Sequence, residues 1–218
     1  MSKILLGIDE AGRGSLIGPL VIAGVILKKE SLDVLKEIGV RDSKKLSRKK
    51  REELYKELIK VCDGIKIKCI PPQIIDKQNL NELEIKCFSE MINYFRPEKV
   101  YIDAPVNKNG IDKFTDSLRK FLMDKDTELI IKNKADSFYS IVSAASIIAK
   151  VKRDLVIKRL RERYGDFGWG YPGEKKVKEF LYRAIKEKKS LTIIRKKWST
   201  FKKSLFFQGL IKYNKSEL

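Results

Sequence analysis

The chain has 218 residues, and its 48 lysines and arginines outnumber its 29 aspartates and glutamates, so the formal net charge is +19. It contains no histidine, which excludes nucleophile systems with a histidine base and zinc sites with histidine ligands. The three cysteines form no CxxC pair, so we expect free thiols and a cytoplasmic location. No segment approaches the about 18 apolar residues of a membrane span, and we expect no membrane partner.

Taken in chain order, the hydrophobic patterns predict an α/β protein. Apolar or alternating runs predict strands at residues 3–9, 20–27, 65–70, 99–103 and 129–132. Amphipathic patterns predict helices at residues 47–61, 81–95, 111–123 and 138–164, and Ser47 is a candidate cap for the first of them. Strands and helices intermix up to residue 132 and helices dominate afterwards. This order predicts a mixed sheet domain at residues 1–165 and a small, basic helical lobe at residues 166–218.

The positive charge is concentrated in the last third of the chain. Residues 150–218 contain 21 basic and 7 acidic residues, a net charge of +14 out of +19. Such a field attracts polyanions, and nucleic acid is the leading candidate. The alternative is a solubilising lysine-rich surface of the kind found in heat-adapted proteins, in which glutamate would rise together with lysine.

Four acidic residues do not fit a solvated helical face. Asp9 and Glu10 end the first apolar strand, Asp103 ends the strand at residues 99–103, and Asp136 precedes a helix rich in small residues. A buried carboxylate is costly unless it is paired or binds a metal, and strand ends lie at the rim of a sheet where sites form. Carboxylates suit Mg²⁺ or Mn²⁺, and two such ions can activate water and stabilise the leaving oxygen in phosphoryl transfer.

The spacing of Asp136, Ser143 and Lys150 adds a second pattern. These residues are seven positions apart, which places them within about 20° of one helical stripe. The stripe predicts a polar face on an otherwise apolar helix. The alternative is a helix N-cap at Asp136 followed by two solvent-facing polar positions.

The string GIDEAGRGSLIGP at residues 7–19 resembles the first motif of type 2 ribonucleases H, the ribonuclease HII family. Five further stretches resemble the family's motifs in the same order, and the last of them is most like the archaeal branch. They are RDSKKL at 41–46, YIDA at 101–104, KADSFYSIVSAASIIAKVKRD at 134–154, GWGYP at 168–172 and RKKWSTFKK at 195–203. The resemblance therefore covers nearly the whole chain.

The resemblance implies a ribonuclease H-like fold, a mixed β-sheet flanked by helices with a small helical C-terminal lobe. It implies an endonuclease that uses two Mg²⁺ or Mn²⁺ ions to cut the RNA strand of RNA–DNA hybrids, and we expect a monomer. It also implies cutting on the 5′ side of single ribonucleotides embedded in duplex DNA, with 3′-hydroxyl and 5′-phosphate products.

Site residues follow from the matching motifs. The resemblance implies that the metal ligands and catalytic residues are Asp9, Glu10, Asp103 and Asp136. Main-chain groups of Gly12, Arg13 and Gly14 would read the 2′-hydroxyl, the one group that separates RNA from DNA. Tyr171 would stack on the deoxyribose that follows the ribonucleotide. The implied phosphate contacts are Ser43, Lys44, Ser143, Ser146 and Lys150.

Four positions depart from the family pattern. Ser15 stands where proline is usual after the Gly-Arg-Gly turn. Asn133 stands where histidine is common, and Glu174 and Val177 stand where archaeal members have aspartate and threonine. The segment at residues 205–213 has the composition of the family's sliding-clamp-binding motif but not its spacing, so clamp binding stays open. We expect a type 2 enzyme rather than type 3, because type 3 enzymes usually carry an N-terminal substrate-binding domain that we expect this chain to lack.

Two other classes of function remain as alternatives. A non-catalytic nucleic-acid-binding protein on the same fold would be expected to lack at least one of the four acids, and all four are present. An architectural protein of the ribosome or of chromatin would explain the positive charge. It would not explain four acidic residues at the ends of strands and at the start of a helix.

Overall fold

The computed structural model describes residues 3–40, 46–187 and 192–198. The chain divides into two compact units, the first made of residues 1–11, 21–69 and 79–152 and the second of residues 12–20, 70–78 and 153–218. The division differs from the predicted boundary after residue 165. The second unit begins at Arg153, within a helix, and includes two segments from the first half of the chain.

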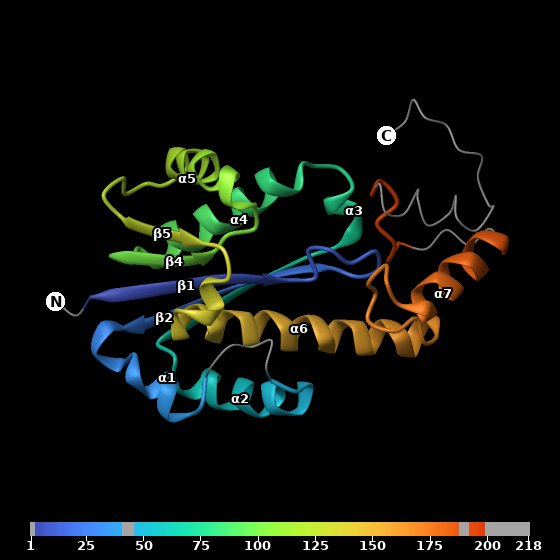
Figure 1. The fold of residues 1–218 in the computed structure, drawn as a ribbon, viewed down its shortest axis with the longest axis horizontal. Coiled ribbons are helices and arrows are strands. Elements are labelled where there is room, and N and C mark those ends of the chain that lie inside the picture. The colour runs from blue at the N-terminus through green and yellow to red at the C-terminus, as the bar shows by residue number, and fades with distance from the viewer. Residues whose placement is uncertain (1–2, 41–45, 188–191, 199–218) are drawn as a thin grey trace. The chain divides into compact units, whose positions relative to one another are not determined.

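The first unit is built on a five-stranded mixed sheet (Figure 1). Its strands are β1 (Ile4–Ala11), β2 (Leu20–Lys28), β3 (Gly64–Ile70), β4 (Lys99–Asp103) and β5 (Glu128–Lys132). Their order in the sheet is β3-β2-β1-β4-β5, with β1 antiparallel to β2 and parallel to β4, and β4 parallel to β5. Every predicted strand is present, and the predicted mixed α/β sheet is confirmed.

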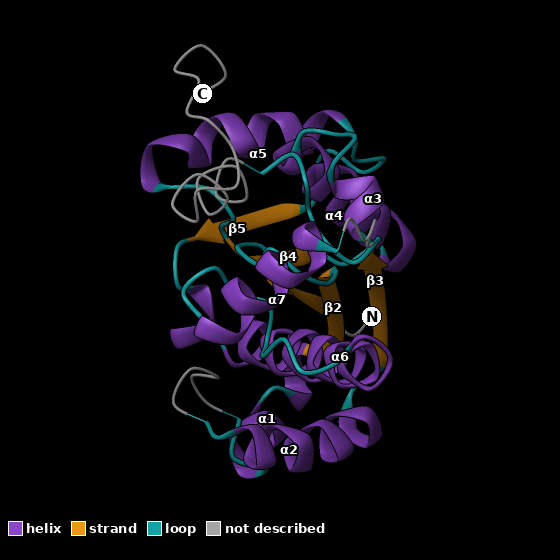
Figure 2. Ribbon diagram, turned by 90° about the vertical axis from the view of Figure 1, so that its right-hand side faces the viewer, coloured by secondary structure: helices purple, strands orange, loops and turns teal. Residues whose placement is uncertain are grey.

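Helices cover both faces of this sheet. Helices α4 (Leu80–Phe95) and α5 (Ile111–Lys120) lie on one side, and α1 (Asp33–Glu37), α2 (Arg48–Val61) and the first half of α6 (Ser140–Tyr164) lie on the other (Figures 1 and 2). Along β2, Val21, Ala23 and Val25 join the core on the α6 side, while Gly24 faces Met91 of α4. Since the strand is buried on both faces, it reads as an apolar run rather than an alternating one.

Local signals explain most helix boundaries. The Ser47 hydroxyl accepts a hydrogen bond from the Lys50 N–H at 3.2 Å and caps α2, as predicted. Helix α5 ends at Lys120, three residues before the predicted end, and α6 begins at Ser140 instead of residue 138. The short helices α1 and α3 (Pro72–Ile75) were not predicted, because one turn of helix carries too little periodicity to recognise.

The second unit has its own core. It includes α3, the second half of α6, α7 (Lys175–Lys186), the loop at residues 12–20 and a segment at residues 192–198 that consists mostly of turns. Its fully buried residues include Leu16, Ile17, Ile157, Phe167 and Leu181, and Ile17 forms a β-bridge with Ile194. Among the residues that the structure describes, no helix combines the length and the hydropathy of a membrane span.

Candidate active site

Two parallel strands bring Asp9 and Asp103 together. Ile8 of β1 is in register with Ile102 of β4, and the next residue on each strand is an aspartate. With Asp136 they form a group of three carboxylates whose oxygen atoms all lie within 4.8 Å of one another. Asp9 and Asp136 are only 4% and 2% exposed, so these charges lie close together with little water around them.

Asp136 is placed by the turn that joins β5 to α6. Lys134 adopts a left-handed conformation (φ 59°), and residues Ala135–Ser137 form a single turn of 3-10 helix. The Ala135 N–H donates to Oδ1 of Asp103 at 3.0 Å, which ties this turn to the end of β4. The predicted polar stripe is therefore wrong at its first member. Asp136 does not lie on α6, because the helix begins only at Ser140.

Helix α6 supplies the polar neighbours of Asp9. Gly7 of β1 lies so close to the Ile141 backbone that a Cβ there would overlap the carbonyl group, which lets the helix pack directly on the strand. The Ser146 hydroxyl hydrogen-bonds Asp9, and the Lys150 Nζ donates to the Ser146 Oγ at 2.8 Å. Ser143 and Ser146 are buried, so the phosphate contacts of these hydroxyls stay predictions.

The pKa of Asp9 is raised to about 7, first by burial and second by the negative charge of Asp103. The hydrogen bond from Ser146, the positive charge of Lys150 and the N–H of Glu10, which lies 2.6 Å from Oδ1 of Asp9, act in the opposite direction. Three hard oxygen donors held this closely match the ligands that Mg²⁺ and Mn²⁺ take in proteins. A divalent cation would also offset the repulsion from Asp103, which is the second cause of this raised pKa.

Glu10 lies outside this group of three. It follows Asp9 on β1, where successive side chains alternate between the two faces of the sheet. Its side chain is half-buried, and its backbone N–H contributes to the group by donating to Asp9. The role of Glu10 as a fourth metal ligand stays a prediction that rests on the sequence motif.

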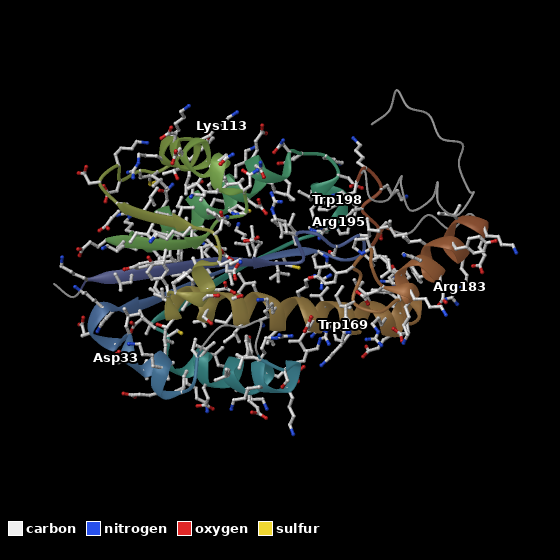
Figure 3. The ribbon with its side chains drawn as sticks, viewed as in Figure 1. Asp33, Lys113, Trp169, Arg183, Arg195 and Trp198 are labelled. Atoms are coloured by element: carbon white, nitrogen blue, oxygen red, sulfur yellow. The ribbon has the colours of Figure 1, made fainter. Side chains whose placement is uncertain are left out.

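The glycine-rich loop after β1 belongs to the second unit, and one arginine organises it. Arg195 is fully buried, and its guanidinium donates to the carbonyl oxygens of Gly12 (2.7 Å), Arg13 (2.8 Å) and Gly18 (3.1 and 3.2 Å). The Ser15 hydroxyl also donates to the Gly12 carbonyl at 2.9 Å. Gly12 and Gly18 have φ values of 86° and 89°, a region that glycine occupies without strain. Figure 3 labels Arg195 beside Trp198, whose ring centroid lies 5.1 Å from the guanidinium.

The Glu174 carboxylate binds two main-chain groups of the Gly-Trp-Gly-Tyr-Pro turn. Glu174 accepts the N–H of Trp169 at 2.7 Å and the N–H of Tyr171 at 3.0 Å. The Tyr171 side chain is 39% exposed, and the Arg153 guanidinium lies 4.8 Å from its ring centroid. Glu174 thus departs from the family pattern yet has a clear local role, while Val177 is a fully buried residue of the second core.

Within the second unit, hydrogen bonds join the glycine-rich loop to the Gly-Trp-Gly-Tyr-Pro turn. The Gly170 carbonyl accepts the N–H groups of Leu16 (2.8 Å) and Ile17 (3.1 Å). Arg153, 2% exposed, donates to the carbonyls of Trp169 (2.9 Å) and Ile17 (3.4 Å). The sequence reasoning missed these bonds. Arg195 lies in a recognisable motif, but no sequence signal separates Arg153 from the other basic residues of α6.

The remaining predicted residues divide into two groups. Asn133 replaces the usual histidine, and its Nδ2 donates to the carbonyls of Val106 (2.6 Å) and Ala104 (3.4 Å), which fastens the segment after β4. Ser43, Lys44 and the clamp-motif segment at residues 205–213 lie outside the described residues.

Comparisons with known proteins agree with this geometry. The family model described as Ribonuclease HII matches residues 6–201. The ribonuclease HII of Methanococcus maripaludis (strain C5) is 45% identical over 212 residues, covering 93% of this chain and 87% of that protein. The ribonuclease HII of Thermococcus kodakarensis is 41% identical over 204 residues, covering 91% and 88%.

Two solved structures share the fold over nearly their full length. The ribonuclease H2 of Pyrococcus horikoshii superposes with a TM-score of 0.83 at 39% identity, covering 92% of this chain and 96% of that one. The PCNA:RNase HII complex from Archaeoglobus fulgidus contains a chain with a TM-score of 0.82 at 35% identity, covering 98% of this chain and 100% of that one. The predicted fold is therefore confirmed.

Proposed function

Because this chain belongs to the ribonuclease HII family and is thus a ribonuclease H enzyme, we propose that it cuts the RNA strand of RNA–DNA hybrids. We propose further that it cuts on the 5′ side of single ribonucleotides in duplex DNA, leaving 3′-hydroxyl and 5′-phosphate ends. The observation that carries the proposal is the group of Asp9, Asp103 and Asp136, whose carboxylate oxygens lie within 4.8 Å of one another.

Asp9, Asp103 and Asp136 would hold divalent cations, with Glu10 as the fourth carboxylate. Two Mg²⁺ or Mn²⁺ ions bound there would supply the activated water and stabilise the charge on the leaving oxygen. A site of this kind needs no histidine as general base, which agrees with a chain that contains none. The three aspartates are supplied by the ends of β1 and β4 and by the 3-10 turn, so the sheet fixes their spacing before any cation binds.

The chain's own residues orient this group. Ser146 and Lys150 hydrogen-bond in series toward Asp9, which favours its ionised form and fixes its direction. The hydrogen bond from the Ala135 N–H fixes the direction of the Asp103 side chain. We propose that the half-buried ammonium of Lys150 also meets a substrate phosphate, as a cation at the edge of an acidic group can do.

Selectivity for RNA would come from the glycine-rich loop. Arg13 is half-buried and Gly14 is exposed, while the carbonyls of Gly12 and Arg13 are occupied by Arg195. We propose that main-chain groups of Arg13 and Gly14, the less buried residues of this stretch, contact the 2′-hydroxyl. We propose that the exposed ring of Tyr171 stacks on the following sugar, where a second 2′-hydroxyl would be in the way.

The test is cleavage of a duplex that carries one ribonucleotide, compared with the same duplex in all-DNA form. With Mg²⁺ or Mn²⁺ we expect a single cut 5′ of the ribonucleotide, with the ends mapped as 3′-hydroxyl and 5′-phosphate. A chelator should abolish the cut, and added metal should restore it. An uncut duplex under both metals would favour the alternative of a non-catalytic nucleic-acid-binding protein.

A sliding clamp is a second partner that we propose for the tail at residues 205–213. Its support is that the Archaeoglobus fulgidus relative, matched over 98% of this chain, forms a complex with PCNA. We expect the full chain to bind the clamp of its own organism and the double variant Phe206→Ala, Phe207→Ala to lose binding while keeping cleavage. Equal binding of the clamp by wild type and by the double variant would show that the tail is not the clamp-binding segment.

A further inference from the structure

Arg153 is buried at the point where two substrate-reading segments meet. One guanidinium nitrogen donates to the Trp169 carbonyl at 2.9 Å and to the Ile17 carbonyl at 3.4 Å, so a single group contacts both the turn and the loop. The same guanidinium lies 4.8 Å from the Tyr171 ring centroid. All of these residues belong to the second unit.

Because its charge is buried, Arg153 does not occupy an ordinary solvent-exposed position on α6. Arg153 is 2% exposed, and taking a guanidinium out of water is costly unless its donors are used. Its Nη2 donates to two backbone carbonyls, which cannot rearrange as side chains can. A planar guanidinium holds such acceptors at a fixed separation, whereas a lysine ammonium is a compact point charge.

We propose that Arg153 is a positioning residue that sets the spacing between the glycine-rich loop and the Tyr171 ring. The proposal rests on the function proposed above, in which the loop reads the 2′-hydroxyl and the ring reads the next sugar. A fixed spacing matches a ribonucleotide followed by a deoxyribonucleotide. Arg153 therefore favours cutting at an isolated ribonucleotide over cutting within continuous RNA, although it contacts neither sugar.

Gly170 offers an independent way to disturb the same spacing. Its carbonyl accepts the N–H groups of Leu16 and Ile17, and its φ is 90°. A Cβ at this position would overlap the Ile17 carbonyl, so Gly170→Ala should push the loop and the turn apart while Arg153 stays intact. Both variants should then show the same change in selectivity.

The experiment compares wild type, Arg153→Lys, Tyr171→Ala and the double variant on a single-ribonucleotide duplex and on a continuous RNA–DNA hybrid. We expect Arg153→Lys to reduce kcat/KM on the single-ribonucleotide duplex about tenfold more than on the hybrid. In the Tyr171→Ala background the same change should have no further effect on this ratio, because the ring that Arg153 positions is gone. Gly170→Ala should shift the ratio in the same direction as Arg153→Lys.

Melting curves give each variant's midpoint, and all rates are measured well below it. An equal loss on both substrates, or a ratio change that persists without the Tyr171 ring, would overturn the proposal. Loss of the folded state in both Arg153→Lys and Gly170→Ala would assign these contacts to stability alone and would also overturn it. If wild type cuts neither substrate, the proposed function itself fails, so the two failures are distinguishable.

Discussion

Asp9 is the residue on which cleavage should depend most, because it is buried beside Asp103 and Asp136 and receives the bonds from Ser146 and Glu10. Asparagine has the same shape but is a poor ligand for a hard cation. We expect Asp9→Asn to lower the cleavage rate by at least about 100-fold, beyond the about 10- to 100-fold typical of outer-sphere metal-site changes. Cleavage of the single-ribonucleotide duplex measures this effect, and fluorescence anisotropy measures binding.

The control for this variant is its stability without metal. Replacing a buried carboxylate that repels its neighbours should leave the melting temperature unchanged or higher at pH 8. Binding of the duplex should stay close to that of wild type. A near-normal cleavage rate, or a rate lost together with the fold, would contradict the assignment of Asp9.

Asp166 illustrates a residue with a pH-dependent role in stability. Hydrogen bonds from Lys176 and from the Gly168 N–H, together with the nearby Arg161, lower the pKa of this aspartate to about 2. A lowered folded-state pKa means that the contribution to stability is complete above the unfolded value of about 3.9 and is lost as the pH falls through about 2. The side chain is 40% exposed, so the effect is screened by solvent.

Asp166→Asn should therefore lower the melting temperature at pH 6, and the difference from wild type should shrink steadily between pH 4 and pH 2. Thermal unfolding of the two proteins at matched ionic strength measures this difference. A gap that stays constant down to pH 2 would show that the ionised form of Asp166 contributes nothing.

At the scale of elements, the contact between β1 and α6 decides the geometry of the acidic group. Gly7 allows the Ile141 backbone to lie against the strand, and the same helix carries Ser146 and Lys150 to Asp9. A methyl group at Gly7 would meet main-chain atoms, which cannot move aside like a flexible side chain.

We expect Gly7→Ala to destabilise the protein by about 1–3 kcal/mol, the usual cost of overpacking, and to reduce cleavage by moving α6 away from β1. Chemical denaturation and cleavage rates measure the two effects. Gly39→Ala is the matched control for folding free energy, since Gly39 has open space around its Cβ position but a φ of 88°. It should lose stability through backbone strain alone and keep its cleavage rate.

At the scale of the whole molecule, charge is divided between an acidic group at the end of the sheet and a strongly basic last third. Contacts between lysine and phosphate release counterions, so affinity for a duplex should fall steeply as salt rises. Lys175 and Lys178 on α7 are both exposed.

The double variant Lys175→Gln, Lys178→Gln should bind duplexes more weakly and show a smaller slope of log affinity against log salt, by about 0.9 for each phosphate that the variant no longer neutralises. Its preference between the single-ribonucleotide duplex and the continuous hybrid should not change, since phosphate contacts carry no such information. Anisotropy titrations over a range of salt concentrations measure the slope. An unchanged slope would place α7 away from the bound duplex.

The sequence by itself determined the family, the strand and helix inventory and the candidate acidic residues. Strand periodicity, capping at Ser47 and the position of acidic residues at strand ends are local properties, so they are legible in a short window of residues. The absence of histidine is likewise read directly from the sequence. It excluded one class of chemistry and agreed with another that relies on carboxylates.

Only the tertiary structure decided which of these residues meet. The sheet order places β4 beside β1 and so brings Asp103 to Asp9, although 94 positions separate them in the chain. The tertiary structure also shows that α6 begins after Asp136 and that Arg153 and Arg195 are buried among backbone carbonyls. These facts depend on pairing between distant segments, and local periodicity does not specify which distant backbone a side chain will meet.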